Sequence, residues 1–167
     1  MTVTQSNLIT NREDKSNQIP RGEQAHIRCA LAHYEAAGAI SDNDIVLLAE
    51  IPVDARISSI RFWSDDLGTT GELNLGFYAG KADIASLVAG DAVDEDALAT
   101  AIDVNAAALA DVELRFEEKD LSTISDTAWE LAGLASRPSY GTFLIALTAS
   151  EATTAAGGIA TAIYYTE

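Results

Sequence analysis

The sequence predicts a mainly β protein, with an antiparallel β-sandwich or jelly-roll-like body that follows an extended N-terminal arm. Three observations predict this fold class. Short segments of alternating apolar and polar residues recur along the chain, turn-forming residues separate them, and few stretches have helical periodicity. About eight strands with one to three short helices favour antiparallel sheets, because parallel strands need regular helical crossovers. We therefore divide the chain into an arm, residues 1–24, and a sandwich domain, residues 25–167.

The first 24 residues have the composition of a segment without a core of its own. They are rich in Ser, Thr, Asn and Gln and show no usable periodicity. Segments of this kind are either disordered or ordered on a partner. We interpret this one as an arm that a partner holds. Its candidate anchors are the apolar residues and the proline: Val3, Leu8, Ile9, Ile19 and Pro20.

Alternation with a period of two predicts six strands, over residues 26–34, 57–63, 73–77, 112–116, 143–147 and 159–165. A continuous apolar run from Ile45 to Ile51 predicts a seventh strand, buried on both faces and ended by Pro52. Within 57–63 the apolar positions change phase, which indicates a β-bulge or a two-sided strand. We expect loops over residues 64–71 and 148–158, where turn-forming or small residues gather.

Helices are expected in three places. Residues 83–88 have an aspartate at the start and a glycine soon after the end, which is typical of a short helix. The segment 94–101 begins with three acidic residues and continues with an apolar pattern, and acidic residues are favoured at helix starts. Thr127 and Glu130 have the spacing of a capping box, which predicts a short helix that ends near Gly133.

The charge is distributed unevenly along the chain. The net charge is −16, but residues 1–28 carry +1 and residues 29–167 carry −17. A body this acidic repels nucleic acid and anionic membranes, so neither is expected as a partner. Solubility alone is a sufficient explanation of the acidic body, and the alternative is that the acidic body faces solvent while the nearly neutral arm faces a partner. No apolar stretch approaches the length of a membrane span, and we expect no signal peptide.

Cysteine and histidine give little sign of a reactive or metal site. Cys29 is the only cysteine, so an intrachain disulfide is excluded, which fits a reducing compartment. Ile27 and Leu31 share its face, and we expect Cys29 to fill the core. His26 and His33 are seven residues apart in one predicted strand, so they point to opposite faces and make a poor metal pair. We expect no metal and no cofactor.

No constellation of catalytic residues is evident, so we expect neither an enzyme nor a small-molecule substrate. The acidic clusters at 42–44, 65–66 and 94–96 lack the spacing of a calcium loop and fall at predicted turns or helix starts. The sequence contains no glycine-rich phosphate-binding motif. Five aromatic residues are expected in the core and at sheet edges, although they are also of a kind that lines sugar sites: Trp63, Tyr78, Tyr140, Tyr164 and Tyr165.

Several motifs, taken in order, suggest a family. They are Ala55-Arg56-Ile57 followed by Ile60, Ser64-Asp65-Asp66-Leu67, the segment 73–78, Trp129-Glu130-Leu131-Ala132-Gly133-Leu134, the segment 145–148 and Ile163-Tyr164-Tyr165. Over about residues 25–167 the chain resembles small virion proteins of tailed bacteriophages encoded beside the major capsid gene, of the head decoration or cement type.

The resemblance implies a sandwich or jelly-roll module that binds the outside of an icosahedral shell. It implies the major capsid protein as partner, a terminal arm in contact with capsid subunits, and often a homotrimer. The protein would be assembled in the host cytoplasm and lie on the outer surface of the virion. The resemblance carries over no catalytic residues.

Two other hypotheses remain open. The first is a carbohydrate- or receptor-binding sandwich of a phage tail or fibre, which predicts an exposed aromatic platform built from Trp63, Tyr78 or Tyr140. The second is an enzyme, which predicts a cleft containing a carboxylate with a strongly perturbed pKa.

Overall fold

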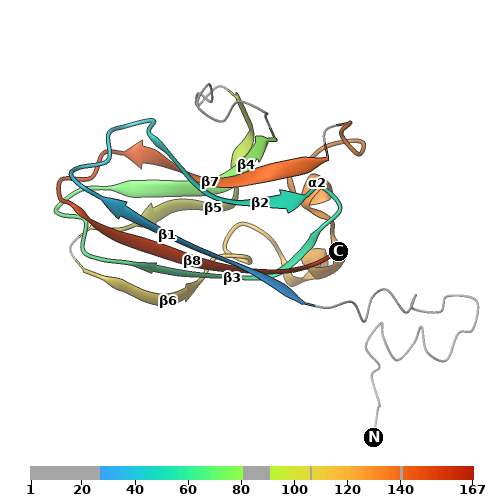
Figure 1. Cartoon of the computed structure of the whole chain (residues 1–167), viewed down its shortest axis with the longest axis horizontal. Helices are drawn as coiled ribbons and strands as arrows, with labels where there is room; N and C mark the ends of the chain where they lie inside the picture. Colours follow the sequence, from blue (N-terminus) through green and yellow to red (C-terminus); the bar gives the residue numbers. More distant parts are fainter. Residues whose placement is uncertain (1–26, 81–90, 106, 140) are drawn as a thin grey trace, which may run out of the picture.

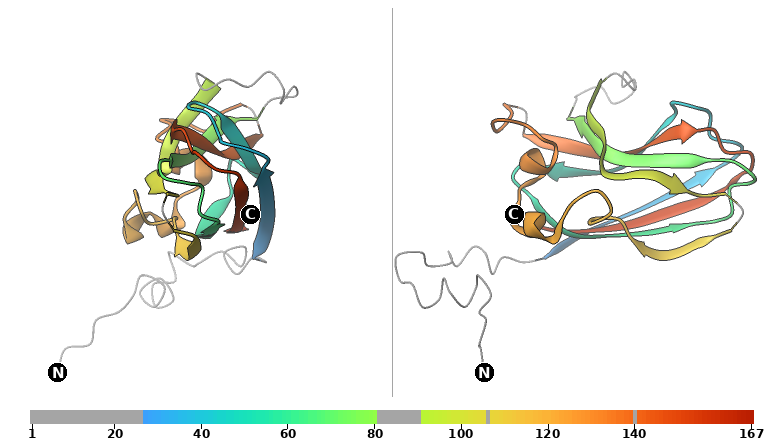
Figure 2. Two further views of the ribbon diagram at one scale, coloured as in Figure 1. Left: turned by 90° about the vertical axis from the view of Figure 1, so that its left-hand side faces the viewer. Right: turned by 180° about the vertical axis from the view of Figure 1, so that it is seen from behind.

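The computed structural model describes residues 27–80, 91–105, 107–139 and 141–167, and over these residues it contains two four-stranded antiparallel sheets. Sheet A contains, in spatial order, β1 (Arg28–Ala36), β8 (Gly157–Thr166), β3 (Arg56–Ser64) and β6 (Leu109–Glu113). Sheet B contains β2 (Ile45–Pro52), β7 (Thr142–Glu151), β4 (Glu72–Ala79) and β5 (Ala92–Asp103). The two sheets form two layers (Figures 1 and 2). The predicted fold class is confirmed.

The order of pairing is jelly-roll-like. Strand β1 pairs with β8, β2 with β7, β3 with β6 and β4 with β5, and all four pairs are antiparallel. The first strand thus pairs with the last, the second with the second-last, and so on to the two middle strands. Such a chain follows the path of one long hairpin that is wrapped into two layers. As a result, both β1 and β6 lie at the edges of sheet A.

The core lies between the two sheets and is built from alternate residues of their strands. Phe62 and Ile163 of sheet A and Phe77 and Phe143 of sheet B are fully buried in one cluster. The rings of Phe77 and Phe143 pack with centroids 5.2 Å apart in a tilted arrangement, which is a favourable geometry for aromatic pairs. Burial of these side chains is the main favourable contribution to folding.

Two short helices lie together at one end of the sandwich. They are the 3-10 helix η5 (Leu121–Ser125) and α2 (Ala128–Leu131). The predicted capping box is confirmed, because Glu130 accepts hydrogen bonds from the backbone and hydroxyl of Thr127. The first amides of α2, on Ala128 and Trp129, donate to the carbonyl groups of Ala55 and Val53 and so fix the helix beside β3.

Arg115 joins η5 to sheet A from a fully buried position. Its Nε donates to the Ile57 carbonyl over 2.9 Å, and its Nη2 donates to the Thr123 carbonyl over 2.8 Å. Its guanidinium also lies over the ring of Phe116, 4.9 Å from the centroid. Burial lowers the pKa of Arg115, and the nearby Asp126 and Glu113 oppose that effect. A buried charge needs such partners, so Arg115 is a structural tie.

The predicted helix over 94–101 is wrong, because this segment belongs to β5. Gly76 on the neighbouring β4 explains the difference. A side chain at Gly76 would meet the backbone of Asp94 and Glu95, so the absence of one lets β5 approach β4 closely. The pairing of β4 with β5 shifts register three times, and these bulges hide the period of two in the sequence. The helix predicted over 83–88 lies outside the described residues.

Three smaller predictions also change. Residues 45–51 do form a strand, but β2 is an edge strand of sheet B whose residues are mostly half-buried, with Glu50 exposed, so it is not buried on both faces. The loop predicted from 148 begins later, because β7 continues to Glu151. The strand predicted over 112–116 ends at Glu113. The bulge predicted within 57–63 is confirmed by a register shift between Ile57 and Ser59.

Candidate functional site

Three alternate apolar residues face outward, Ile27 just before β1 and Cys29 and Leu31 within it, and we call them the apolar stripe. Ile27 is 69% exposed, Leu31 is 79% exposed, and Cys29 is exposed as well. The expectation that Cys29 fills the core is therefore wrong. The alternation of apolar and polar residues predicted the strand correctly, but the face of the strand that we expected to point into the core points outward. Register decides the face, because Ala30 lies opposite the buried Ile163 of β8 and packs against the core.

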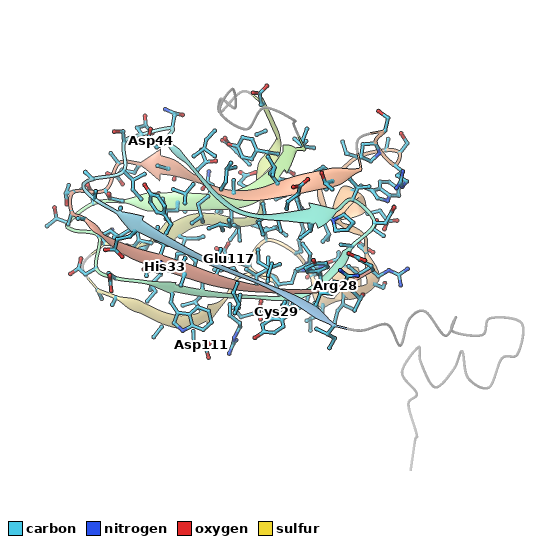
Figure 3. All side chains as sticks on the ribbon, in the orientation of Figure 1. Arg28, Cys29, His33, Asp44, Asp111 and Glu117 are labelled. Atoms are coloured by element: carbon cyan, nitrogen blue, oxygen red, sulfur yellow. The ribbon has the colours of Figure 1, made fainter. Side chains whose placement is uncertain are left out.

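The apolar stripe lies on an edge strand. Among the described residues β1 pairs with β8 on one side and with no strand on the other. Figure 3 labels Cys29 near the beginning of β1 and His33 farther along it. On β8, the half-buried Tyr164 lies opposite Cys29 and extends the apolar surface, whereas Ala162, opposite Leu31, is buried. An unpaired edge with exposed apolar side chains is a typical site for association with another chain.

The candidate anchors predicted from the sequence lie outside the described residues. This applies to Val3, Leu8, Ile9, Ile19 and Pro20, and the arm as a unit remains a prediction. The segment that contains them leads directly into Ile27 and the apolar stripe. His26 and Tyr140 also lie outside the described residues.

Farther along the same face, sheet A has a shallow depression of about 350 Å³. Its floor is formed by β8, where Gly158 and Ala160 have little or no side chain. Around the floor stand side chains from neighbouring strands and the loop after β3: His33, Glu35, Trp63 and Asp65. Because β8 lies between β1 and β3, the fold brings together residues from distant parts of the sequence. We call this feature the sheet A depression.

The polar groups of the depression are partly fixed in position. Asp65 Oδ2 accepts a hydrogen bond from the Gly158 amide over 2.7 Å. His33 Nε2 and Glu35 Oε2 are 3.7 Å apart, and both side chains are about two-thirds exposed. Sequence reasoning found Asp65 only as part of a turn and did not connect it with Glu35. No sequence motif reports this neighbourhood, because strand pairing alone creates it.

The aromatic platform expected for a sugar-binding protein does not form from Trp63 and Tyr78. Tyr78 is fully buried in sheet B, where its hydroxyl and that of Thr148 share a 2.7 Å hydrogen bond. Burial raises the pKa of Tyr78, and this hydrogen bond opposes the effect. Trp63 lies on sheet A and is half-buried at the depression. Tyr164 and Tyr165 are half-buried on β8.

The described residues show no assembled metal or membrane site. Within them, no group of three or more His, Cys, Asp or Glu side chains is placed to hold a metal ion. No helix in this part of the chain is long and apolar enough to cross a membrane. Burial, followed by interaction with Asp96, raises the pKa of Asp94. Asp94 lies on sheet B, whereas the depression is on sheet A, so the two features do not form one site.

Comparison with known proteins identifies a structural similarity but no family. No protein-family model matches the sequence, and no curated protein matches it. Among solved structures, a chain of the "Cyanophage Pam1 capsid asymmetric unit" matches with a TM-score of 0.50 and 15% identity. The match covers 85% of this chain and 85% of the other. At this level of identity the similarity establishes a shared fold, so the described body has a β-sandwich fold that is also found in a phage capsid.

Proposed function

We propose that the chain is a structural, non-enzymatic protein of a phage virion that binds the major capsid protein and decorates the outside of the shell. The fold shared with a chain of a cyanophage capsid supports a capsid-associated role. The resemblance to head decoration proteins, drawn from separate sequence motifs, points in the same direction. In this proposal the protein cements neighbouring capsid subunits after both have been made in the host cytoplasm.

The observation that carries the proposal is the apolar stripe on the edge strand β1. Burying one Leu or Ile side chain contributes about 1.5–3 kcal/mol, so capsid contact with Ile27 and Leu31 is a substantial source of affinity. The edge of β1 that pairs with no described strand can also accept a strand from the partner, which adds backbone hydrogen bonds. The stripe and the segment before it would then form one continuous attachment region.

Charge supports placing attachment at this end of the chain. Residues 1–28 carry a net charge of +1, whereas the rest of the chain carries −17. Many copies packed on one shell repel one another through their acidic bodies. A nearly neutral attachment region avoids adding to that repulsion at the contact itself. We further propose a homotrimer, since head-to-tail contacts around a three-fold axis form a closed ring.

The proposal is tested by co-sedimentation with shells assembled from the major capsid protein of the same phage. Four proteins are compared: the full chain, a truncation that lacks residues 1–24, Leu31→Ser and Leu121→Ser. Leu121 is the matched control, because it is 70% exposed against 79% for Leu31 but lies on η5. Circular dichroism verifies that each variant retains its β fold.

We expect the truncation to abolish sedimentation with shells and Leu31→Ser to weaken it by about tenfold to a hundredfold. Leu121→Ser should bind like the full chain. Undiminished binding by the truncated protein would exclude the arm as the attachment segment. Equal loss in the two serine variants would exclude the apolar stripe as the contact.

A further inference from the structure

We propose that the sheet A depression is a binding site for an organic cation, namely the guanidinium or ammonium group of an Arg or Lys side chain on a partner protein. This site lies beyond the attachment region, and the inference does not depend on the proposed capsid role. Four features of the depression favour such a ligand: its shape, the polar atoms gathered at its floor, its charge and its aromatic wall.

Polar atoms of three side chains gather around Gly158 at the floor of the depression. A carbon atom placed where a Cβ would stand on Gly158 lies 3.1 Å from Glu35 Oε2, 3.2 Å from Asp65 Oδ2 and 3.5 Å from His33 Nε2. This point is one bond length from the Gly158 Cα, so the distances show that the three polar atoms lie close together around Gly158, and a ligand donor would meet them from the open space above it. Because residue 158 is glycine, no side chain of the protein stands between these three polar atoms.

The charge of the lining favours a cation. Two carboxylates, Glu35 and Asp65, line the depression together with His33, and the lining includes neither Lys nor Arg. The neighbouring cation Arg61 is engaged elsewhere, because its Nη2 lies 2.7 Å from Asp111 Oδ2 and its Nη1 lies 3.8 Å from Glu113 Oε2. The whole chain carries −16, so a cation gains attraction at long and short range while an anion is repelled.

Trp63 distinguishes this site from a merely acidic surface. In the strand register Trp63 and His33 lie on either side of Ala160, so the indole stands across the floor from β1. A cation near an indole gains about 0.5–1 kcal/mol at an exposed site, and the aliphatic stem of Arg or Lys packs against the same ring. The hydrogen bond from the Gly158 amide to the Asp65 carboxylate holds that carboxylate in place before a ligand arrives, which reduces the entropy lost on binding.

The test is a titration of the free, full-length, ¹⁵N-labelled chain followed by NMR. The probe is N-acetyl-arginine amide, and the neutral control is N-acetyl-citrulline amide, which has nearly the same shape without the charge. Methyl α-glucoside is the third probe, because carboxylates beside an indole also bind sugar hydroxyls. The reporters are the Gly158 amide and the Trp63 indole N–H.

We expect the arginine probe to shift both reporters, and the citrulline probe to bind at least about tenfold more weakly, which corresponds to 1.4 kcal/mol. Gly158→Ala should weaken binding by a similar factor without changing the charge, because its methyl group would crowd the Glu35 and Asp65 carboxylates and displace them. Gly38→Ala is the matched control, since a Cβ there has no atom within 4 Å, and it should bind like the parent.

A second pair of variants tests the charge. Glu35→Gln combined with Asp65→Asn should weaken binding of the arginine probe at least about tenfold, whereas Asp42→Asn combined with Glu118→Gln removes the same charge elsewhere and should change it little. Equal binding of arginine and citrulline probes would overturn the proposal. Shifts produced by the glucoside instead would assign the depression to a sugar, and an absence of shifts from every probe would mean that it binds none of these groups.

Discussion

Gly76→Ala is predicted to destabilise the protein because β5 lies directly over this residue. The new Cβ would stand 2.5 Å from the Glu95 carbonyl oxygen and closer still to that of Asp94. Ordinary C···O contacts begin at about 3.3 Å, so the β5 backbone must move by about 1 Å. Forcing an extra carbon into a packed site costs about 1–3 kcal/mol, which for a chain of this length lowers Tm by roughly 4–8 °C at the middle of that range.

The measurement is urea denaturation together with the Tm from circular dichroism, with Gly38→Ala in parallel. A Cβ at Gly38 meets nothing within 4 Å, so this control should be neutral or more stable by up to about 1 kcal/mol, because alanine restricts the unfolded chain. If the two variants were equally stable, β5 would not cover Gly76, and the helix expected over 94–101 would again have to be considered.

Three further predictions concern the helical end of the sandwich and its surface. Arg115→Met removes hydrogen bonds to the Ile57 and Thr123 carbonyls and should cost about 2–4 kcal/mol in urea denaturation; a loss below about 1 kcal/mol would contradict its role as a tie. Thr127→Ala removes the capping box and should cost about 1 kcal/mol. It should also raise the pKa of Glu130, because it removes the Thr127 hydroxyl bond that is the main cause of the lowered pKa, and an unchanged Glu130 titration by NMR would argue against that bond. The paired Arg137 lowers the pKa of Asp54 below 3.8, so the stability that this pair contributes is present above that pH and is lost as pH falls through the folded-state pKa. Arg137→Gln should return the Asp54 pKa toward 3.8 in a carboxyl NMR titration, and a pKa that stays low would refute the assignment.

Most of the fold could be predicted because strands with one buried face reveal themselves by alternation. The strands around Phe62, Leu75, Ile145 and Ile163 were found in this way, and each of these side chains is fully buried. The segment over 94–101 escaped because its bulges depend on Gly76, a residue in another strand. No property local to residues 94–101 shows that contact.

The face of β1 was also beyond sequence reasoning. Ile27, Cys29 and Leu31 have the larger apolar side chains, yet Ala30 is the residue packed against the core. An exposed apolar stripe and a buried one have the same sequence pattern, so only register with β8 distinguishes them. The same limit applies to the sheet A depression, because Glu35, Asp65 and Gly158 meet only after β1, β3 and β8 have paired.

The reactivity of the Cys29 thiol on the assembled shell tests the central claim most directly. Cys29 is the only cysteine in the chain and is exposed within the apolar stripe, so a maleimide reagent labels the native protein at one place. The control is Leu121→Cys, which leaves the apolar stripe intact and adds a second thiol on η5 at a position that is 70% exposed in the parent, and peptide mapping measures the labelling of the two thiols separately. If the stripe contacts the capsid, labelling of Cys29 should slow by at least about tenfold on saturated shells while the control thiol keeps its rate. Equal labelling rates for free and shell-bound Cys29 would contradict attachment through β1.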